Sequence, residues 1–122
     1  MSGYEDVAKQ FVEFYYNTFD SDRSQLTPLY RDNSMLTFET ASVLGAAGIV
    51  EKLKGLPFQR IKHVVNVLDA QPTINDGVIV LVSGQLQVDE EERPMNFTQV
   101  FHLAKDGGNY FVYNDIFKLI FG

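Results

Sequence analysis

The sequence contains no cysteine, and this absence excludes disulfides, catalytic thiols and thiolate metal sites. Basic residues are also scarce: 10 Lys and Arg stand against 16 Asp and Glu, which gives a formal net charge of -6. A molecule of this charge repels phosphate groups, so the composition argues against nucleic acid and anionic membranes as partners. A basic patch on another protein would instead be attracted, and that association would be salt-sensitive.

Long apolar runs are missing as well. No run approaches the roughly 20 residues that a membrane helix needs. The first residues contain neither the basic segment nor the apolar segment of a signal peptide. We therefore expect a soluble, intracellular protein without membrane insertion.

The residues that are present are sufficient for one domain spanning residues 1–122. The chain is 45% hydrophobic, which is enough apolar material to fill a single core. Its ten Phe and six Tyr are large rings that must be buried in a core, a pocket or an interface. Helical patterns come first along the chain and strand patterns follow, an order that predicts the α+β class.

Helical spacing of apolar residues predicts three helices in the first half of the chain. Repeats of three and four residues indicate a helix over residues 4–19. A short second helix is expected to run through Leu26 and Tyr30, and a third from Ile49 to its end at Pro57.

Strand patterns account for the rest of the chain. A first strand is expected over residues 35–39, followed by a loop to Gly45. Segments rich in Val, Ile, Phe and Tyr then predict a long antiparallel meander, because turn residues separate them. These segments cover residues 60–70, 78–88, 97–104 and 109–121.

Both faces of this meander carry apolar side chains. Residues 78–82 are continuously apolar, and residues 109–121 have large apolar side chains at both odd- and even-numbered positions. Such strands need cover on both sides, and three helices can cover only one face of a curved sheet. We therefore expect the other face to be buried in a homodimer about a two-fold axis.

Two acidic features are candidate binding sites. Residues 89–92, Asp-Glu-Glu-Glu, lie at a hairpin, where they form either a solvated turn or a docking site for Lys or Arg. Glu39 follows Phe38 at the end of a strand, and this pair suits a ligand that is both basic and aromatic. A plain edge-strand charge explains Glu39 equally well.

Other polar residues favour structural interpretations. His63 and His102 have no carboxylate or histidine at ligand spacing, so we expect satisfied or surface histidines and no metal site. The Gly45-Ala46-Ala47-Gly48 segment indicates a turn before a helix, since the Lys-Ser/Thr of a P-loop is absent. Tyr15 and Tyr16 with Asp69 or Asp115 could support proton transfer, but core tyrosines and a strand-end carboxylate are the simpler interpretation.

Several segments, in order from Tyr4 to Phe121, resemble the nuclear transport factor 2 family, particularly its fungal members. They are FYYN at 14–17, FDSDRSQL at 19–26, MLTFE at 35–39, IVEKL at 49–53, LPFQ at 56–59, DAQP at 69–72, GQL at 84–86 and NDIF at 114–117. The resemblance implies a cone-shaped α+β fold, with three N-terminal helices packed in a strongly bent antiparallel sheet. It also implies homodimerisation through the sheet, no cofactor and no catalytic activity.

The resemblance also implies partners and sites. Members of the family carry GDP-bound Ran into the nucleus, taking an aromatic side chain of Ran into the open end of the cone. They cross the nuclear pore by binding FxFG repeats, and so occur in cytoplasm and nucleus and concentrate at pores. Carried onto this chain, Glu39, Asp89 and Glu91 are the rim carboxylates and Tyr4 is the repeat-binding aromatic residue. The pocket would be lined by Phe38, Leu56, Ile61, Leu81, Val100, Ile116 and Phe117.

Two other functions are compatible with such a fold. Ketosteroid isomerase-like and dehydratase-like enzymes use the same cone, but they need ionisable groups deep in the pocket. The positions assigned to the pocket here are apolar, which argues against an enzyme. A non-carrier interaction domain, as in messenger RNA export or stress-granule proteins, is the third possibility, and such domains usually accompany other domains or a different partner chain.

Overall fold

The computed structural model describes residues 3–90 and 93–120, and its first element is the long helix α1 (Gly3–Ser21). The buried face of α1 includes Val12, Tyr15 and Phe19, which recur at helical spacing. Glu5 and Asp6 lie in the first turn, where carboxylates favour the positive end of the helix dipole. The predicted helix over residues 4–19 is confirmed, and it begins one residue earlier and ends two later.

The two shorter helices differ more from their predicted bounds. The second is the 3-10 helix η1 (Arg23–Leu29), and Tyr30 already begins the next strand. Asp22 caps it, because its carboxylate accepts from the backbone N–H of Ser24 at 3.0 Å. The third helix, α2 (Ala46–Lys54), ends before Gly55 and not at Pro57.

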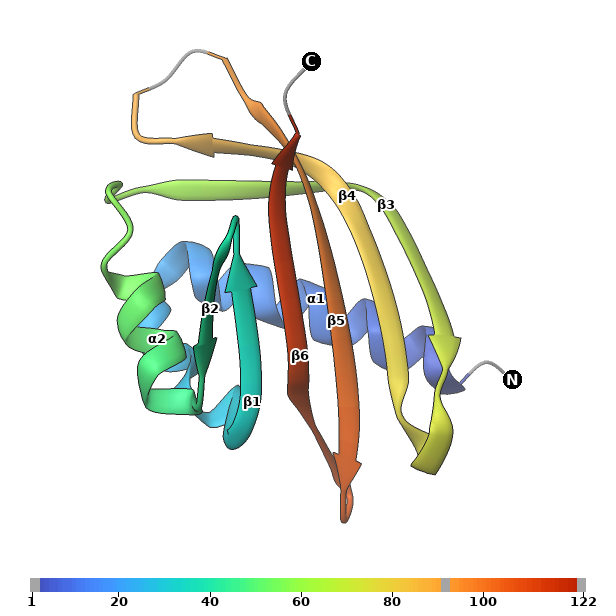
Figure 1. The fold of residues 1–122 in the computed structure, drawn as a ribbon. Helices are drawn as coiled ribbons and strands as arrows, with labels where there is room; N and C mark the ends of the chain where they lie inside the picture. Colours follow the sequence, from blue (N-terminus) through green and yellow to red (C-terminus); the bar gives the residue numbers. More distant parts are fainter. Residues whose placement is uncertain (1–2, 91–92, 121–122) are drawn as a thin grey trace.

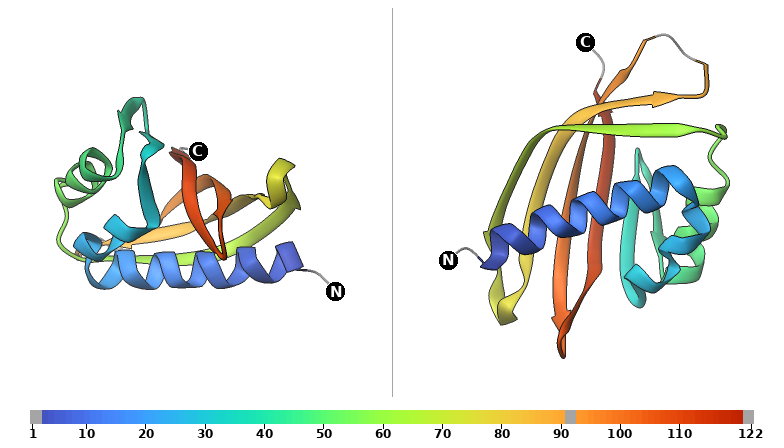
Figure 2. Two further views of the ribbon diagram at one scale, coloured as in Figure 1. Left: turned by 90° about the horizontal axis from the view of Figure 1, so that it is seen from below. Right: turned by 180° about the vertical axis from the view of Figure 1, so that it is seen from behind.

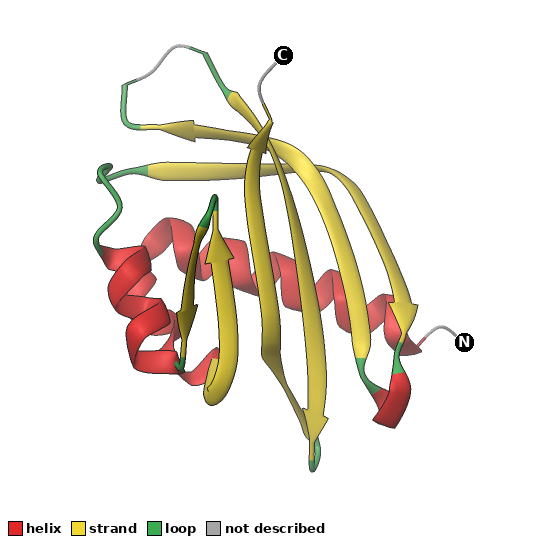
Figure 3. Ribbon diagram, in the orientation of Figure 1, coloured by secondary structure: helices red, strands yellow, loops and turns green. Residues whose placement is uncertain are grey.

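Six strands form one curved sheet around these helices (Figure 1). The order across the sheet is β2-β1-β6-β5-β4-β3, and α1 runs along its concave side (Figure 2). Figure 3 shows that the strands make up most of the molecule, with η2 (Ile74–Asp76) in the connection between β3 and β4. The strands are β1 (Tyr30–Phe38), β2 (Ala41–Leu44), β3 (Ile61–Pro72), β4 (Val78–Val88), β5 (Met95–Asp106) and β6 (Asn109–Ile120).

The meander of β3 to β6 confirms the predicted antiparallel order, but the sheet as a whole is mixed. β1 pairs parallel with β6, so the predicted antiparallel sheet includes one parallel pair. This pair was missed because apolar patterning identifies a strand but does not show in which direction it pairs with its neighbour. The predicted loop up to Gly45 instead contains β2, whose four residues alternate too briefly to stand out and which pairs antiparallel with β1.

The paired strands β3 and β4 bend sharply near the middle of their length (Figure 1). The register between these strands shifts between Val65 and Val67, and Gly84 lies opposite Val65. A Cβ atom on Gly84 would lie 2.0 Å from the carbonyl oxygen of Val64, so the two backbones approach too closely for any other residue. This bend wraps the strands around a core of rings that includes Tyr15, Phe97 and Phe101.

Candidate functional site

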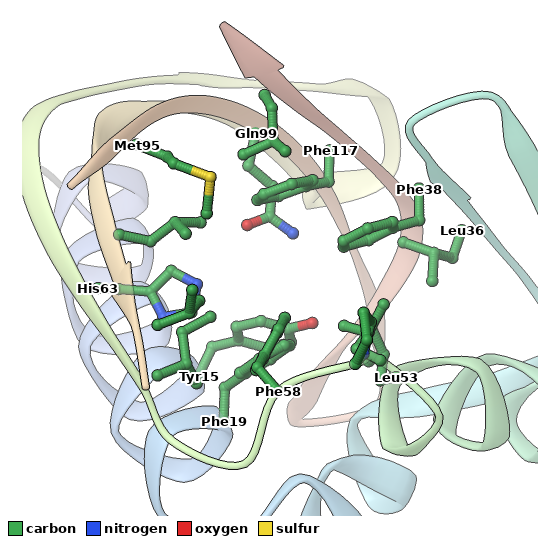
Figure 4. Close-up of a pocket in the computed structure, with 16 residues that line it drawn as sticks. Tyr15, Phe19, Leu36, Phe38, Leu53, Phe58, His63, Met95, Gln99 and Phe117 are labelled. Carbon is green, nitrogen blue, oxygen red and sulfur yellow. The ribbon is translucent and has the colours of Figure 1, made fainter. Parts of the chain in front are cut away.

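An apolar cavity of about 280 Å³ lies at the end of the sheet where β3 and β5 begin and β1, β4 and β6 end (Figure 4). Leucine, isoleucine, valine and phenylalanine side chains from α1, β1, the α2–β3 connection and β3 to β6 line it. The rings of Phe38 and Phe117 are stacked, with 4.6 Å between centroids and 5° between planes. The few polar side chains in the wall belong to Tyr15, His63 and Gln99. The cavity therefore suits an apolar, flat group.

Four of the seven residues predicted to line this pocket do so. They are Phe38, Leu56, Ile61 and Phe117. The side chains reach the cavity from three directions, since Phe38 ends β1, Leu56 follows α2, Ile61 begins β3 and Phe117 lies on β6.

The other three, Leu81, Val100 and Ile116, were wrongly placed in the pocket. They lie side by side on β4, β5 and β6, on the face of the sheet turned away from α1, and Leu81 and Ile116 are 43% and 48% exposed. Successive residues of a strand point to opposite faces, and their neighbours Val80 and Phe117 take the inner positions. Since these strands are apolar on both faces, the sequence could not distinguish inside from outside.

Glu39 lies beside the cavity, in the tight turn between β1 and β2. Its φ of 61° is a left-handed conformation. Its backbone N–H donates to the carbonyl of Phe117 at 3.0 Å, and its side-chain Oε1 accepts from the N–H of Leu119 at 2.7 Å. Both Phe117 and Leu119 line the cavity, so the turn holds a carboxylate at the rim.

Asp89, the second predicted rim residue, caps the segment that leads into β3. Its Oδ1 accepts from the N–H groups of Arg60 and Gln59, both at 2.9 Å. The hydrogen bond from Arg60 and then that from Gln59 lower the pKa of the Asp89 carboxyl, which keeps it ionised. Glu90 pairs with the exposed guanidinium of Arg60. Glu91, the third predicted rim residue, lies outside the described residues.

Arg23 also holds the rim in place, although it was not among the residues predicted from the sequence. Arg23 donates to the carbonyl of Leu53 at 3.1 Å and to that of Phe58 at 2.9 Å. Its guanidinium also lies 4.8 Å from the ring centroid of Phe58. Arg23 thereby fixes the connection between α2 and β3, which forms one wall of the cavity. No sequence pattern pairs an arginine with carbonyl groups 30 residues away.

A buried polar network lies behind the inner end of the cavity. Asp115 is fully buried and accepts from Gln99 at 2.7 Å, from the hydroxyl of Tyr30 at 2.8 Å and from that of Tyr15 at 3.4 Å. Burial raises the pKa of its carboxyl to about 6, although these three hydrogen bonds act in the opposite direction. Burial likewise raises the pKa of Tyr15 well above its ordinary value. Ionisable groups therefore do converge here, but Asp115 itself does not line the cavity.

Both histidines are hydrogen-bonded within the fold, as expected for structural histidines, although the sequence named no partner for either. His63 Nδ1 lies 2.7 Å from Asp20 Oδ1, and His102 lies 3.2 Å from both Thr73 and Asn114. Within residues 3–90 and 93–120, no three His, Asp or Glu side chains are grouped as metal ligands would be. The same described part of the chain contains no helix long and apolar enough to cross a membrane.

Tyr4 lies in the first turn of α1, where 36% of it is exposed. Tyr15 and Phe19, further along the helix, line the cavity. The helical rise places Tyr4 about 16 Å along the axis from Tyr15, the nearer of the two. Any ligand of Tyr4 therefore occupies a surface separate from the cavity.

Comparison with known proteins identifies this architecture. A model of the nuclear transport factor 2 domain matches residues 7–119. The chain belongs to the nuclear transport factor 2 family. It is 58% identical to nuclear transport factor 2 of Emericella nidulans over 123 aligned residues, which cover 99% of this chain and 98% of that protein. Family membership indicates a role in nuclear transport rather than catalysis.

Solved structures agree with this family assignment. Nuclear transport factor 2 of Cryptosporidium parvum superimposes with a TM-score of 0.92 at 41% identity, covering 96% of this chain and 94% of that one. A putative scytalone dehydratase from Novosphingobium aromaticivorans also superimposes, with a TM-score of 0.79 at 13% identity over 96% of this chain and 85% of that chain. That second likeness shows the fold alone.

The convex face of this nuclear transport factor 2 fold is unusually apolar for an exposed surface. We call it the outer face. Leu81, Val100 and Ile116 form a row across β4, β5 and β6. Further exposed apolar residues extend it along the sheet: Val64, Val67, Ile79 and Ile120. A contiguous apolar surface of this kind is typical of a protein interface.

Proposed function

We propose that this chain is a homodimeric carrier that binds GDP-bound Ran and brings it through the nuclear pore. The observation that supports this best is the apolar cavity with Glu39 held at its rim. An aromatic side chain of Ran would fill the cavity, and a neighbouring basic residue would pair with the carboxylate. A buried aromatic anchor surrounded by charge pairs is the usual composition of an interaction hot spot.

The size and wall of the cavity suit that anchor. An engineered apolar cavity of roughly 150 Å³ binds benzene in another protein, so about 280 Å³ accommodates a phenyl ring with its methylene. The stacked pair Phe38 and Phe117 presents ring faces and edges to it. Selectivity for GDP would follow if Ran exposes this aromatic side chain only in its GDP-bound conformation.

Charge supports the same partner. The net charge of -6 attracts a basic surface and accelerates its association. Glu39 and Asp89 lie on different sides of the cavity mouth, after β1 and β4 respectively, and would receive basic residues around the aromatic anchor. The proposal also includes Glu91 among the carboxylates that pair with Ran.

The outer face supports the homodimer. Leu81, Val100 and Ile116 lie in one row, so two copies related by a two-fold axis could bury the row against itself. The cavity opens on the other side of the sheet, so dimerisation would leave it accessible to a partner.

Passage through the pore would use Tyr4. We propose that FxFG repeats of nucleoporins stack on this exposed ring, with weak contacts that allow rapid release. The carrier would then be found in cytoplasm and nucleus, with a concentration at the pores.

A pull-down with purified Ran tests the carrier function. The immobilised protein should retain Ran loaded with GDP and should not retain Ran loaded with GTP under the same conditions. Equal retention of both forms, or of neither, would overturn the proposal. Raising the salt concentration should weaken retention of the GDP form, since the rim contacts are electrostatic.

A further inference from the structure

Nε2 of His63 lies in the cavity wall and makes no hydrogen bond with a side chain of residues 3–90 or 93–120, so it stays accessible from the cavity. The side chain of His63 is only 2% exposed. Figure 4 shows its ring turned toward the interior of the cavity. No side-chain nitrogen or oxygen of the described residues is both buried and unpaired, so this nitrogen keeps contact with the open space of the cavity, where a ligand can reach it.

The other polar side chains of the wall are already paired. Tyr15 bonds with Tyr30 and Asp115, with oxygen–oxygen distances of 2.6 and 3.4 Å. Gln99 accepts from Tyr16 and donates to Asp115, both at 2.7 Å. Among the polar side-chain atoms of the wall, Nε2 of His63 is therefore the one available for a hydrogen bond with a ligand.

Asp20 determines whether Nε2 of His63 donates or accepts a hydrogen bond. One carboxylate oxygen lies 2.7 Å from Nδ1 of His63, and the other accepts from the backbone N–H of the same residue at 3.0 Å. A carboxylate can only accept, so Nδ1 carries the proton, and in the neutral ring Nε2 is left as an acceptor. The ring of Tyr16 stacks on the imidazole, 4.2 Å away and 12° from parallel, which fixes its orientation.

We propose that this cavity also binds a free planar aromatic molecule of the indole class, whose single N–H donates to Nε2 of His63. Its apolar rings would occupy the space between the phenylalanines, and its N–H would pair with the imidazole nitrogen that is accessible in the wall. The cavity of about 280 Å³ has room for two fused rings, as roughly 150 Å³ holds one. This binding goes beyond the carrier function and does not depend on it.

Titration of the protein with indole and with indene tests the proposal. The two molecules have nearly the same shape, but indene has a CH₂ group in place of the N–H. Calorimetry should show saturable binding of indole and about tenfold weaker binding of indene, the effect of losing one buried hydrogen bond. In the ¹⁵N NMR spectrum, the Nε2 signal of His63 should shift with indole and stay in place with indene.

Two variants locate the interaction. His63→Phe keeps a flat ring but removes the acceptor, so it should bind indole and indene equally. Asp20→Ala removes the group that keeps the proton on Nδ1, so it should reduce the preference for indole. The control variant His102→Phe changes the other histidine, which does not line the cavity, and should keep the tenfold preference.

Equal affinity for indole and indene in the unaltered protein, or no saturable binding of indole, would overturn the proposal. These two measurements need no variant, so they remain decisive even if His63→Phe does not fold. A preference for indole that persists in folded His63→Phe would also contradict it. None of these titrations contains Ran, and their outcome is therefore independent of the pull-down with Ran.

Discussion

The side chain of Glu39 accepts a hydrogen bond from the backbone N–H of Leu119, with 2.7 Å between Oε1 and the nitrogen. This bond connects the turn after β1 with the end of β6, across 80 residues of sequence. One carboxylate oxygen is thereby used within the fold, while the negative charge remains at the rim. Glu39 therefore has a structural and an electrostatic role, which different substitutions can separate.

Substitutions of Glu39 should weaken the binding of Ran-GDP in graded steps. Glu39→Gln keeps an oxygen that can accept from Leu119 but removes the charge, so we expect a loss of about 1 to 2 kcal/mol. Glu39→Lys places like charges opposite each other and should cost roughly 2 to 5 kcal/mol. Calorimetry with Ran-GDP measures both, and thermal unfolding of Glu39→Gln serves as the control for an intact rim. Unchanged binding of Glu39→Lys would remove Glu39 from the site.

Leu81→Glu should dissociate the homodimer. The substitution places a charge in the centre of the outer face, where it would be buried without a partner. Sedimentation at micromolar concentration should show mostly 13.8 kDa monomer for this variant and dimer for the unaltered protein. Phe14→Glu, which changes an exposed aromatic residue of α1, is the matched control and should remain dimeric. A monomeric unaltered protein would contradict the assignment of the outer face.

Tyr4→Ala should weaken the binding of FxFG repeats without affecting Ran-GDP, because about 16 Å of helix separates Tyr4 from Tyr15, the nearest residue of α1 in the cavity wall. Loss of an exposed stacking ring should lower repeat affinity by about 1 kcal/mol. Retention on a column of immobilised repeats measures this effect. Tyr4→Phe keeps the ring and should be retained normally, and so should Phe14→Ala. Normal retention of Tyr4→Ala would exclude Tyr4.

The buried carboxyl of Asp115 should make stability depend on pH. Its pKa is raised from 3.8 to about 6 in the fold, so the folded state holds a proton that the unfolded chain releases. The resulting stabilisation is complete below pH 3.8 and is lost as the pH rises through about 6. The difference between the two pKa values corresponds to about 3 kcal/mol.

Urea unfolding at several pH values checks this expectation. The free energy of unfolding of the unaltered protein, relative to that of Asp115→Asn, should fall by about 3 kcal/mol across this range. Asparagine does not titrate, so the variant lacks this contribution while its side-chain carbonyl can still accept from Gln99. Parallel pH profiles of the two proteins would show that Asp115 does not titrate in this way.

Gly84→Ala should destabilise the fold, because the new methyl group would lie 2.0 Å from the carbonyl oxygen of Val64. Separating the two strands to make room should cost about 3 kcal/mol, at the upper end of overpacking effects. Gly108→Ala adds the same methyl group where no atom lies within 4 Å, and it should change stability little. Thermal or urea unfolding compares the two. Equal stability of the two variants would mean that the strands separate without cost at Gly84.

Much of the fold was predictable because its signals are local. The meander strands have long β-branched and aromatic runs bounded by turns, and β4 matches its predicted range of residues 78–88. β2 and the parallel pairing of β1 with β6 were missed. A four-residue strand has too little periodicity, and pairing direction depends on contacts between distant segments.

The site was predictable only in part, for the same reason. Phe38, Phe117 and Glu39 were predicted through the family resemblance. Leu81 was assigned to the wrong face, because its strand has apolar residues on both faces. The pairing of Asp20 with His63 spans 43 residues and follows from no motif. Residues that act through such contacts become visible only in three dimensions.

The alternation of residues along β4 has one more consequence. Val80 and Val82 face the core, whereas Leu81 between them faces outward. Inserting one residue before Val80 would exchange the two sets, exposing core residues and turning outer-face residues inward. The side chains of either face can therefore change separately during evolution, whereas an insertion or deletion of one residue in β4 alters the core and the outer face at the same time.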